Sequence, residues 1–376
     1  MKRSIHVLIG GYYGFYNVGD DAVLAGIIAG LKKRLDHPRL TVLSNDPEHT
    51  EKQFGLEAVN RWQLPAIIRA MRRSDLVILG GGTLLQDRTS PRSPLYYLGL
   101  TTIALLLKKP VFFLGQGFGP IIHPFSQWMI RRVVNRIDGA IMRDKASADE
   151  LIRCGVNQTP VLVAADPALM LDPQTADKKR GEALLKAAGI PLHTPRVFVA
   201  VRHWKTDHPY QHILARVLDD VAEWGYTIVF VAMQHTQDIE PARAIAGYMQ
   251  GKAFVMEQKL KYDQILDLFS TGEALFGMRL HAIIFAALIN LPFVPLSYDP
   301  KIDRFVKTLG LEQAFPIDAL DTETLIAYTR ALFQNLPERR SFLKARMPQT
   351  VQLAEEGMDV LIELYNKKMA KGKNHV

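Results

Sequence analysis

The sequence predicts an α/β protein made of two Rossmann-like, doubly wound domains that face each other across a cleft, followed by a C-terminal helix. Strand-like and helix-like segments alternate closely in the first half, which is the βαβ rhythm of a parallel sheet. A segment with two Asp-Pro pairs then interrupts the pattern, and a second alternation follows it. A chain of 376 residues is long for one core and sufficient for two. The predicted parts are 1–172, 173–345 and, for the C-terminal helix and basic tail, 346–376.

Short apolar runs in the first domain indicate strands that are buried on both faces, and amphipathic or apolar segments between them indicate helices. The predicted strands are 6–11, 39–45, 76–81, 111–115, 139–143 and 161–166. The predicted helices are 22–35, 64–73, 97–108 and 124–136. Residues 166–175 then read as the interdomain linker.

The second domain repeats the alternation, and a final amphipathic helix closes the chain. The predicted strands are 197–202, 227–233, 254–256, 274–277 and 293–296. Pro348 suits the first position of the last helix, and a lysine-rich tail follows at 367–376.

Composition narrows the class of protein. Hydrophobic residues make up 48% of the chain and charged residues 22%, as in ordinary globular proteins. The only cysteine, Cys154, has no partner for an internal disulfide, so we expect a reducing compartment. The apolar runs are too short for a signal peptide or a membrane span. The net charge of +8 favours an acidic partner, and the lack of a reader motif argues against nucleic acid.

The stretch 274–305 in the second domain combines long apolar runs with charged residues at the ends of its predicted strands. It consists of a strand, a short turn, an apolar helix (280–291), a second strand and a polar loop ending in Lys301. Arg279 and His281 lie at the turn between the first strand and the helix, and Lys301 follows the next strand. In a parallel sheet these positions share the carboxyl edge, where ligands bind. A helix N-terminus there also favours an anion. The stretch therefore predicts an anion site for a phosphate, a carboxylate or both.

The neighbours of His281 decide how it is interpreted. A single histidine is more often a core or capping residue than a catalytic one. Burying Arg279, His281 and Lys301 together without an anion would be costly, which favours a ligand site. Arg202 and Gln234, at two other strand ends, either extend this site or are structural.

Glycine-rich turns follow three predicted strands of the first domain, at 10–19, 80–83 and 115–120. Their spacing fits neither a dinucleotide fingerprint nor a Walker loop, so nicotinamide and ATP are disfavoured. Together the turns suggest backbone lining one side of a cleft, although three simple tight turns remain the alternative. In the first turn Asn17 or Asp20 could touch substrate, whereas Asp20 or Asp21 as a helix cap is the structural alternative.

Arg143 ends another predicted strand. The sequence Ser147 to Glu150 has the spacing of a capping box, so we expect the helix to begin at Ser147 and Arg143 to lie in the loop before it. Arg143 then points toward the cleft edge, where it could complete the anion site. A salt bridge to Asp144 or Asp149 is the alternative.

Two basic helical stretches, 69–73 and 131–136, lie beside apolar residues. A solvated helix face is the default interpretation. The more specific interpretation is that these stretches contact an anionic lipid surface.

At this point the sequence resembles the polysaccharide pyruvyl transferase family, and within it the enzymes that modify S-layer-anchoring secondary cell-wall polymers. The matching blocks are GYYGFYNVGDDAVL, LGGGTLLQD, LGQGFGP, MRDKAS, the Asp166-Pro167 pair, GMRLHA and SYDPKID. They span nearly the whole chain, and the Arg279-Leu280-His281 tripeptide is the most distinctive. Arg143 and Lys301 coincide with family positions tied to donor binding.

The resemblance implies a GT-B-like fold, phosphoenolpyruvate as donor, no metal, no cofactor, and a sugar acceptor that receives a ketal. In the S-layer branch the acceptor is a lipid-linked precursor containing N-acetylmannosamine, with a 4,6-ketal as product. It also implies a cytoplasmic enzyme at the inner face of the membrane, with the acceptor on the first domain and the donor on the second.

The chemistry of the residues is consistent with this donor, because cationic groups match the phosphate and carboxylate of phosphoenolpyruvate. The expected catalytic residues are His281, Arg279 and Arg143, with His281 as the proton carrier. The expected donor-binding residues are Arg279, His281, Lys301 and Arg143. The acceptor-side candidates are Asn17, Asp20 and Asp166, and Asp20, Asp21 and Asp166 are weaker candidates for deprotonating the acceptor.

The sequence is also compatible with two other classes of protein. One is a GT-B glycosyltransferase with a nucleotide-sugar donor, weakened by the lack of an obvious acidic ribose clamp. The other is a non-catalytic binder of anionic glycan, which would leave the Arg–His–Lys set unexplained.

Overall fold

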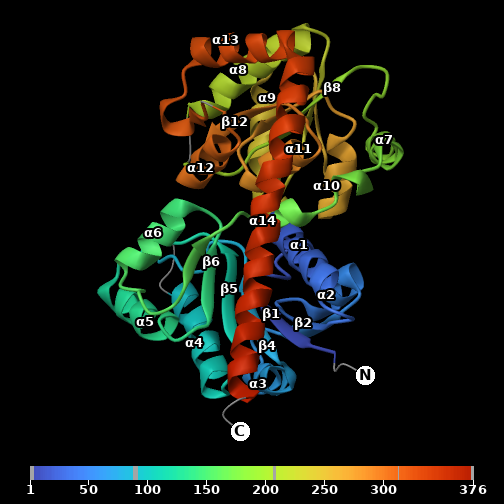
Figure 1. Cartoon of the computed structure of the whole chain (residues 1–376). Coiled ribbons are helices and arrows are strands. Elements are labelled where there is room, and N and C mark those ends of the chain that lie inside the picture. The colour runs from blue at the N-terminus through green and yellow to red at the C-terminus, as the bar shows by residue number, and fades with distance from the viewer. Residues whose placement is uncertain (1–3, 88–91, 206–208, 312, 374–376) are drawn as a thin grey trace. The chain divides into compact units, whose positions relative to one another are not determined.

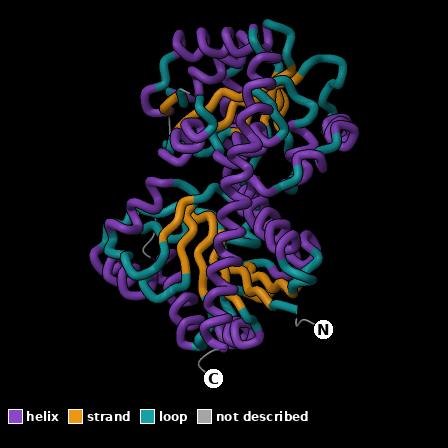
Figure 2. Tube along the Cα trace, viewed as in Figure 1, coloured by secondary structure: helices purple, strands orange, loops and turns teal. Residues whose placement is uncertain are grey.

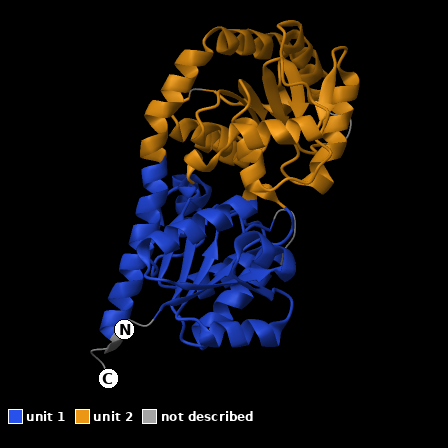
Figure 3. Cartoon of the chain, turned by 90° about the vertical axis from the view of Figure 1, so that its right-hand side faces the viewer, with its two compact units in different colours: residues 1–16, 20–171, 351–376 blue, residues 17–19, 172–350 orange. Residues whose placement is uncertain are grey.

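The computed structural model of the chain describes residues 4–87, 92–205, 209–311 and 313–373 (Figure 1). These residues form two compact units, coloured separately in Figure 3. Unit 1 contains residues 1–16, 20–171 and 351–376, and unit 2 contains residues 17–19 and 172–350. Figure 2 shows the strands of each unit gathered into a layer flanked by helices.

Unit 1 is built on a seven-stranded parallel sheet in the order β3-β2-β1-β4-β5-β6-β7. Its strands are β1 (His6–Gly10), β2 (Arg39–Ser44), β3 (Glu57–Asn60), β4 (Leu76–Gly80), β5 (Val111–Gln116), β6 (Gly139–Met142) and β7 (Val161–Val163). Every residue of the central strands β1, β4 and β5 is buried. This explains their uninterrupted apolar sequences, because helices cover both faces of such a sheet.

The helices of unit 1 connect these strands in sequence. They are α1 (Val18–Arg34), α2 (Pro47–Phe54), α3 (Leu64–Arg73), α4 (Arg92–Leu106), α5 (Pro124–Val134) and α6 (Lys145–Arg153). The strand order places β1 and β4 at the centre, with the chain winding outward in both directions, as in a doubly wound fold.

Unit 2 is built on a six-stranded parallel sheet in the order β10-β9-β8-β11-β12-β13. Its strands are β8 (Arg196–Ala200), β9 (Thr227–Phe230), β10 (Ala253–Val255), β11 (Ala274–Gly277), β12 (Phe293–Ser297) and β13 (Phe315–Pro316). Its helices are α7 (Lys178–Ala187), α8 (Tyr210–Glu223), α9 (His235–Tyr248), α10 (Tyr262–Phe269), α11 (Leu280–Leu288), α12 (Pro300–Thr308) and α13 (Thr322–Gln334). The strands β8, β11 and β12 are neighbours, so their carboxyl ends lie side by side.

The last helix, α14 (Leu336–Lys373), belongs to both units, because the division between them falls at Thr350 and Val351. It was expected to begin at Pro348, but Pro348 lies inside it. The expected tail at 367–376 continues this helix through Lys373, and its last three residues lie outside the described part of the chain.

Two elements of unit 1 were not predicted, for a common reason. The helix α2 has only Thr50 buried, and the edge strand β3 is only partly covered, so neither has a periodic apolar pattern. The caps nevertheless define α2. The Asp46 carboxylate accepts a hydrogen bond from the His49 amide, and Gly55 ends the helix in the left-handed conformation.

Two predicted helix starts are wrong. Helix α1 begins at Val18, where the Asn17 side chain accepts a hydrogen bond from the Gly19 amide at 3.0 Å. Asp20 and Asp21 therefore lie in the first turn and are not caps, although their charge still favours the helix N-terminus.

Helix α6 is capped by Asp144, whose carboxylate accepts from the Ser147 amide. The Ser147 hydroxyl instead accepts from the Phe118 amide at 3.1 Å, so the expected capping box does not form. A cap three residues earlier places Arg143 directly before the helix.

The expected linker at 166–175 is only partly a linker. Its first half is a buried 3₁₀ helix, Pro167–Met170, within unit 1. The division between the units falls later, between Leu171 and Asp172.

Candidate functional site

The candidate donor site lies at the carboxyl edge of the unit 2 sheet. Arg202 follows β8, Arg279 follows β11 and Lys301 follows β12, and these three strands are neighbours. Arg279 stands directly before α11, and Lys301 lies in the first turn of α12. Lys301 was expected in a loop. Its place on a helix instead puts it at a second helix N-terminus, which the Asp299 carboxylate caps by accepting from the Lys301 amide at 3.0 Å.

The guanidinium of Arg279 is held by a carboxylate that the sequence analysis did not identify. Asp238, in the first turn of α9, accepts hydrogen bonds from Nε of Arg279 at 3.1 Å and also from Nη2. The Asp238 side chain is 1% exposed and that of Arg279 is 13% exposed. Asp238 also accepts from the Met233 and Gln234 amides, at 3.2 and 2.9 Å. A carboxylate with this many donors fixes the orientation of Arg279.

This pair corrects the argument that the cations would be buried without an anion. Arg279 already has a buried counter-ion in Asp238. The fork of the guanidinium is therefore pre-oriented, so less side-chain entropy would be lost when a ligand binds to its remaining face.

Tyr298 lies between the other two cations of this edge. The guanidinium of Arg202 is 4.3 Å from the centre of its ring and the ammonium of Lys301 is 5.2 Å from it. Burial by itself raises the pKa of Tyr298, but Lys301 and Arg202, with a smaller effect of Arg279, outweigh burial and lower that pKa below its ordinary value. The local potential is therefore strongly positive. The carboxylate of Asp299, 3.6 Å from the Lys301 ammonium, offsets only part of it.

His281 lies in the first turn of α11 and is half-buried. A side chain at Gly19 would meet it, because a Cβ there would be 2.1 Å from Nδ1 of His281. Gly19 belongs to the short segment 17–19, which is part of unit 2. Only a glycine allows the backbone to approach the imidazole this closely.

Asn17 lies in the same segment and forms an isolated antiparallel bridge with Gln234. The Val18 amide also donates to the Met233 carbonyl, at 3.0 Å. Asn17 was expected on the acceptor side, in the first domain, yet its contacts are with the residues around Asp238 and His281. Gln234, proposed as either ligand-binding or structural, is 9% exposed and precedes α9.

Arg143 lies in unit 1 and is almost fully buried, with 8% of its side chain exposed. Nη2 donates to the Thr83 hydroxyl at 3.2 Å, and Nη1 is 3.5 Å from the Asp166 carboxylate. Asp144 is 3.7 Å away, whereas Asp149, the other expected partner, pairs with Lys145.

Gly117 makes room for this arginine, because a Cβ there would be 2.5 Å from its Nη2. The arrangement joins three carboxyl-end turns of the unit 1 sheet. Thr83 follows β4, Gly117 follows β5 and Arg143 follows β6.

Asp20 occupies the first turn of α1, partly buried, and its carboxylate faces the turn after β4. A Cβ at Gly82 would lie 3.4 Å from its Oδ1. Asp21 is 7% exposed and so less accessible. Asp166 is 4% exposed, and its carboxylate also accepts from the Ala168 amide at 3.1 Å. Of the three acidic candidates, Asp20 is the most accessible.

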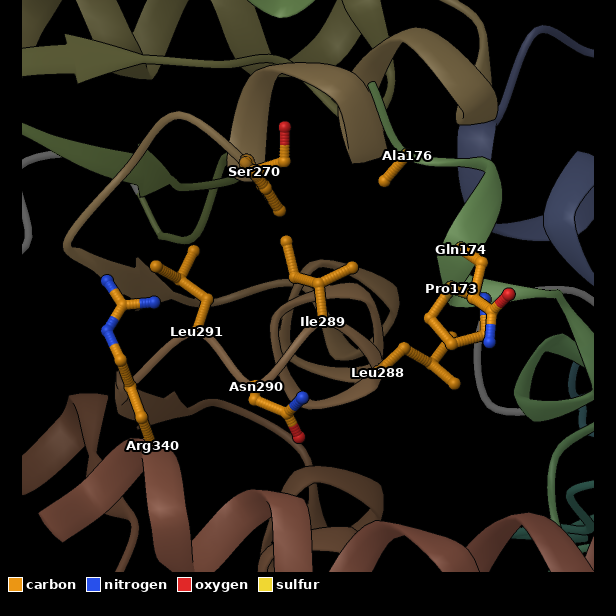
Figure 4. Close-up of a pocket in the computed structure, with 10 residues that line it drawn as sticks. Pro173, Gln174, Ala176, Ser270, Leu288, Ile289, Asn290, Leu291 and Arg340 are labelled. Atoms are coloured by element: carbon orange, nitrogen blue, oxygen red, sulfur yellow. The ribbon is translucent and has the colours of Figure 1, made fainter. Parts of the chain in front are cut away.

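A separate pocket of unit 2 lies away from these residues (Figure 4). Its lining includes Ser270, Ile289 and Asn290, which come just before β11 and β12. It is therefore at the amino edge of the sheet, and its Arg340 already donates to the Glu273 carboxylate at 2.8 Å. Ligands of open α/β sheets bind at the opposite edge, so this pocket is not the candidate site.

Among the described residues, His, Cys, Asp and Glu side chains form no group of three or more that could hold a metal ion. Within 4–87, 92–205, 209–311 and 313–373, no helix has both the length and the apolar character that crossing a membrane requires.

The fold defines the class. The chain superimposes on a UDP-GlcNAc 2-epimerase from Neisseria meningitidis with a TM-score of 0.65 and 12% identity, over 96% of this chain and 100% of that one. It superimposes on HepE from Anabaena, solved with UDP-glucose, with a TM-score of 0.59 and 14% identity, over 98% and 100%. Two parallel-sheet α/β units with these relatives make a GT-B-like fold, and at such identity the likeness concerns the fold alone.

The sequence defines the family. The model of the polysaccharide pyruvyl transferase family matches residues 17–300, so the chain belongs to this family and is a pyruvyl transferase. It is also similar to the amylovoran biosynthesis protein AmsJ of Erwinia amylovora, with 24% identity over 397 residues that cover 88% of this chain and 93% of AmsJ.

Proposed function

We propose that the protein transfers the pyruvyl group of phosphoenolpyruvate to two hydroxyls of one sugar unit, forming a cyclic ketal and releasing phosphate. The observation that carries this proposal is the cationic group of Arg202, Arg279 and Lys301 around Tyr298. Phosphoenolpyruvate carries a phosphate and a carboxylate a few bonds apart. A compact set of cations, two of them at helix N-termini, suits both charges.

Each cation has a distinct part in this proposal. Arg279, oriented by Asp238, offers the remaining edge of its guanidinium to one anionic group of the donor. Lys301 and Arg202 hold the other anionic group of the donor. In the absence of ligand both cations contact the ring of Tyr298, and the bound anion takes over that interaction. Arg143 is the candidate fourth cation. Its contacts with Thr83 and Asp166 fix its guanidinium, which is what an orienting role requires.

The reaction needs one proton delivered and two removed. A proton adds to the methylene carbon of the donor, and one sugar hydroxyl attacks the central carbon and loses its proton. The bond from that carbon to the phosphate oxygen then breaks, and the second hydroxyl closes the ring and loses its proton. One of the two hydroxyl protons balances the new methyl group and the other balances the released phosphate.

His281 is the proposed carrier of the proton that reaches the methylene carbon, because it lies in the first turn of the helix that follows Arg279. Asp20 is the proposed base for an acceptor hydroxyl. Asp166 suits that role less well because Arg143 and the Ala168 amide already engage it.

Two similarities bear on the identity of the acceptor. The sequence blocks resemble the S-layer branch, which favours a lipid-linked precursor with N-acetylmannosamine and a 4,6-ketal, handled at an anionic membrane surface. The similarity to AmsJ favours an exopolysaccharide repeat instead. Both are saccharides with a suitable pair of hydroxyls.

The deciding experiment is incubation of the protein with phosphoenolpyruvate and a panel of synthetic and lipid-linked disaccharides. Released phosphate together with a saccharide heavier by one pyruvyl ketal is the expected result. UDP-sugars in place of phosphoenolpyruvate test the glycosyltransferase alternative. Saccharide binding without turnover of any donor would instead favour the glycan-binder alternative.

A further inference from the structure

An aromatic cluster at the carboxyl edge of the unit 1 sheet has no part in the mechanism described so far. Tyr12 and Phe15 lie in the turn after β1, and Trp62 follows β3. Tyr96 comes from α4 and completes the set. We call these four residues the aromatic platform.

The platform is organised around one buried cation. Arg61 is 4% exposed, and its guanidinium carbon lies 4.3 Å from the ring centre of Tyr96 and 5.1 Å from those of Phe15 and Trp62. Its Nη1 donates to the Gly11 carbonyl at 2.9 Å, which ties it to the end of β1. The Tyr96 hydroxyl donates back to the Arg61 carbonyl at 2.9 Å. The rings are therefore held from beneath by contacts with a fixed guanidinium.

Two rings of the platform are turned toward solvent. Tyr12 is 39% exposed and stacks on Phe15 with ring centres 4.0 Å apart and planes inclined by only 8°. Trp62 is 62% exposed, packs at a tilt against Tyr96, and donates from its indole nitrogen to the Asn45 side chain at 2.9 Å. Large aromatic faces that are exposed yet fixed in position are characteristic of binding surfaces.

The platform lies in the electrostatic field of Asp20. Burial raises the pKa of Tyr12, and the Asp20 carboxylate raises it further against the opposing effect of Arg61. The Tyr12 hydroxyl thus remains a hydrogen-bond donor near the proposed base of the acceptor reaction. Burial raises the pKa of Tyr97, beside Tyr96, to about 12. Arg61 opposes this rise, and Asp20 adds a smaller raising effect.

We propose that the aromatic platform binds the saccharide acceptor, with a pyranose ring stacked on the exposed faces of Tyr12 and Trp62 and its hydroxyls directed toward Asp20. This rests on the proposed function for the identity of the reaction. A pyranose presents C–H bonds on its faces and hydroxyls at its rim. The faces suit the electron-rich rings, and the rim suits flanking polar groups such as Asn45 and Asp20.

Rigid aromatic side chains bind at low entropic cost, and here Arg61 has already fixed them. A nucleotide base would also stack on such rings. The saccharide is favoured because the family acts on polysaccharide and because the Asp20 carboxylate, whose charge acts on Tyr12, would repel a nucleotide phosphate.

The test is direct saccharide binding, measured without donor by intrinsic fluorescence during titration with lactose, cellobiose and a disaccharide of N-acetylmannosamine and N-acetylglucosamine. We expect a change in the wild-type emission with at least one disaccharide. That change should be lost in Trp62→Ala, with affinity by calorimetry about tenfold to a hundredfold lower, as for other stacked rings. Trp62→Phe should recover most of the affinity because it restores an aromatic face.

The matched control is Tyr248→Ala, which removes a tyrosine of unit 2 that is 46% exposed, against 39% for Tyr12, and packs on His212 with ring centres 4.0 Å apart. It should bind saccharide normally, whereas Tyr12→Ala should not. Phosphoenolpyruvate affinity should be unchanged in both tyrosine variants, which separates the platform from the donor site.

The possible failures are distinguishable. Absence of phosphate release from phosphoenolpyruvate would overturn the proposed reaction while leaving saccharide binding to be judged by fluorescence. Normal saccharide affinity in Trp62→Ala and Tyr12→Ala, or no disaccharide binding to the wild type, would overturn the platform. A response to UDP but to no saccharide would assign the rings to a base and overturn it as well.

Discussion

At the scale of single residues, the candidate donor site depends on pairs that join distant parts of unit 2. Asp238 and Arg279 form the most buried of these pairs, and Tyr298 lies within reach of Lys301 and Arg202. The pairing separates two kinds of cation. Arg279 is 13% exposed and already has a buried carboxylate partner, whereas Lys301 is 24% exposed and the more accessible to an anion.

Lys301→Ala should therefore weaken phosphoenolpyruvate binding by about tenfold to a hundredfold, the usual effect of losing a hydrogen bond to a charged group. Calorimetry with the donor alone measures it. Lys307→Ala, in the last turn of the same helix, is the matched control and should bind normally. Equal affinity in both variants would remove Lys301 from the donor site.

His281→Gln should lower turnover by about two to four orders of magnitude, the scale expected for a general acid. Donor affinity should fall less than in Lys301→Ala, because the glutamine amide still offers a hydrogen bond. Steady-state kinetics measure turnover, and calorimetry with the donor alone measures affinity. Near-normal turnover would leave His281 only as a donor contact.

The ionisation of Tyr298 provides a test that needs no turnover. Its pKa is lowered because Lys301 and Arg202 overcome the raising effect of burial. Removing Lys301 should raise this pKa, and bound phosphoenolpyruvate should also raise it, because a nearby anion disfavours tyrosinate. An ultraviolet titration of the wild type minus Tyr298→Phe isolates the signal. A pKa that does not change on donor binding would move the donor away from this ring.

At the scale of secondary-structure elements, helix α5 is the stronger candidate for membrane contact. Phe125 and Trp128 are 59% and 57% exposed, and Arg131 and Arg132 lie in the last turn of the same helix. Helix α3 also ends in two arginines, but Arg73 is paired with Glu57 at 2.6 Å. Exposed aromatic rings beside basic residues are typical of interfacial helices.

Charge reversal at Arg131 and Arg132 should therefore weaken binding to vesicles of anionic lipid more than charge reversal at Arg72 and Arg73. The expected contribution is about 1 kcal/mol for each basic residue near the surface, and binding should fall as salt rises. Vesicle co-sedimentation measures it, and activity on a short water-soluble acceptor should stay unchanged in both variants. Equal binding by all three proteins would move the membrane surface elsewhere.

At the scale of the whole molecule, the proposed donor residues and the proposed acceptor platform belong to different units. Arg202, Asp238, Arg279 and Lys301 all lie in unit 2, and Tyr12, Asp20 and Trp62 all lie in unit 1. Each substrate should therefore slow amide hydrogen exchange in its own unit only.

Phosphoenolpyruvate alone should slow amide hydrogen exchange in unit 2 around residues 233–238, 279–283 and 298–303, because a bound ligand stabilises the folded form of its own site. Disaccharide alone should protect unit 1 around residues 11–16, 20–21 and 61–63. Mass-spectrometric exchange of the unliganded protein and of each binary complex measures both effects. Donor protection confined to unit 1 would contradict the assignment of the donor residues.

Much of the architecture was predictable from the sequence because the central strands are buried on both faces and so are continuous apolar runs. The prediction of two parallel-sheet domains in a GT-B-like fold is confirmed. The strands β1, β4, β8 and β11 were all predicted to within two residues of their observed ends. Elements without that signal, such as α2 and β3, were missed because their residues are largely exposed.

The site was predictable only in part. The alternation of predicted strands and helices places Arg279 and Lys301 after the ends of two strands. A parallel sheet brings the carboxyl ends of its strands to one edge, so the two residues are expected there. The alternation does not reveal that Asp238 holds Arg279, although an acidic residue in the first turn after a strand was a usable signal. The assigned roles of Arg143, His281 and Asp20 remain predictions.

The sequence by itself therefore determined the family, the two parallel sheets and the positions of the charged residues along the chain. The tertiary structure alone decided which of those charges meet. Asp238 reaches Arg279 across 41 residues, Asp166 reaches Arg143, and residues 17–19 join His281 in unit 2. The physical reason is that the apolar pattern of a segment reflects the burial of that segment, so it can be read from the segment's own residues. Ion pairs depend instead on which strands become neighbours, and only the folded sheet settles that order.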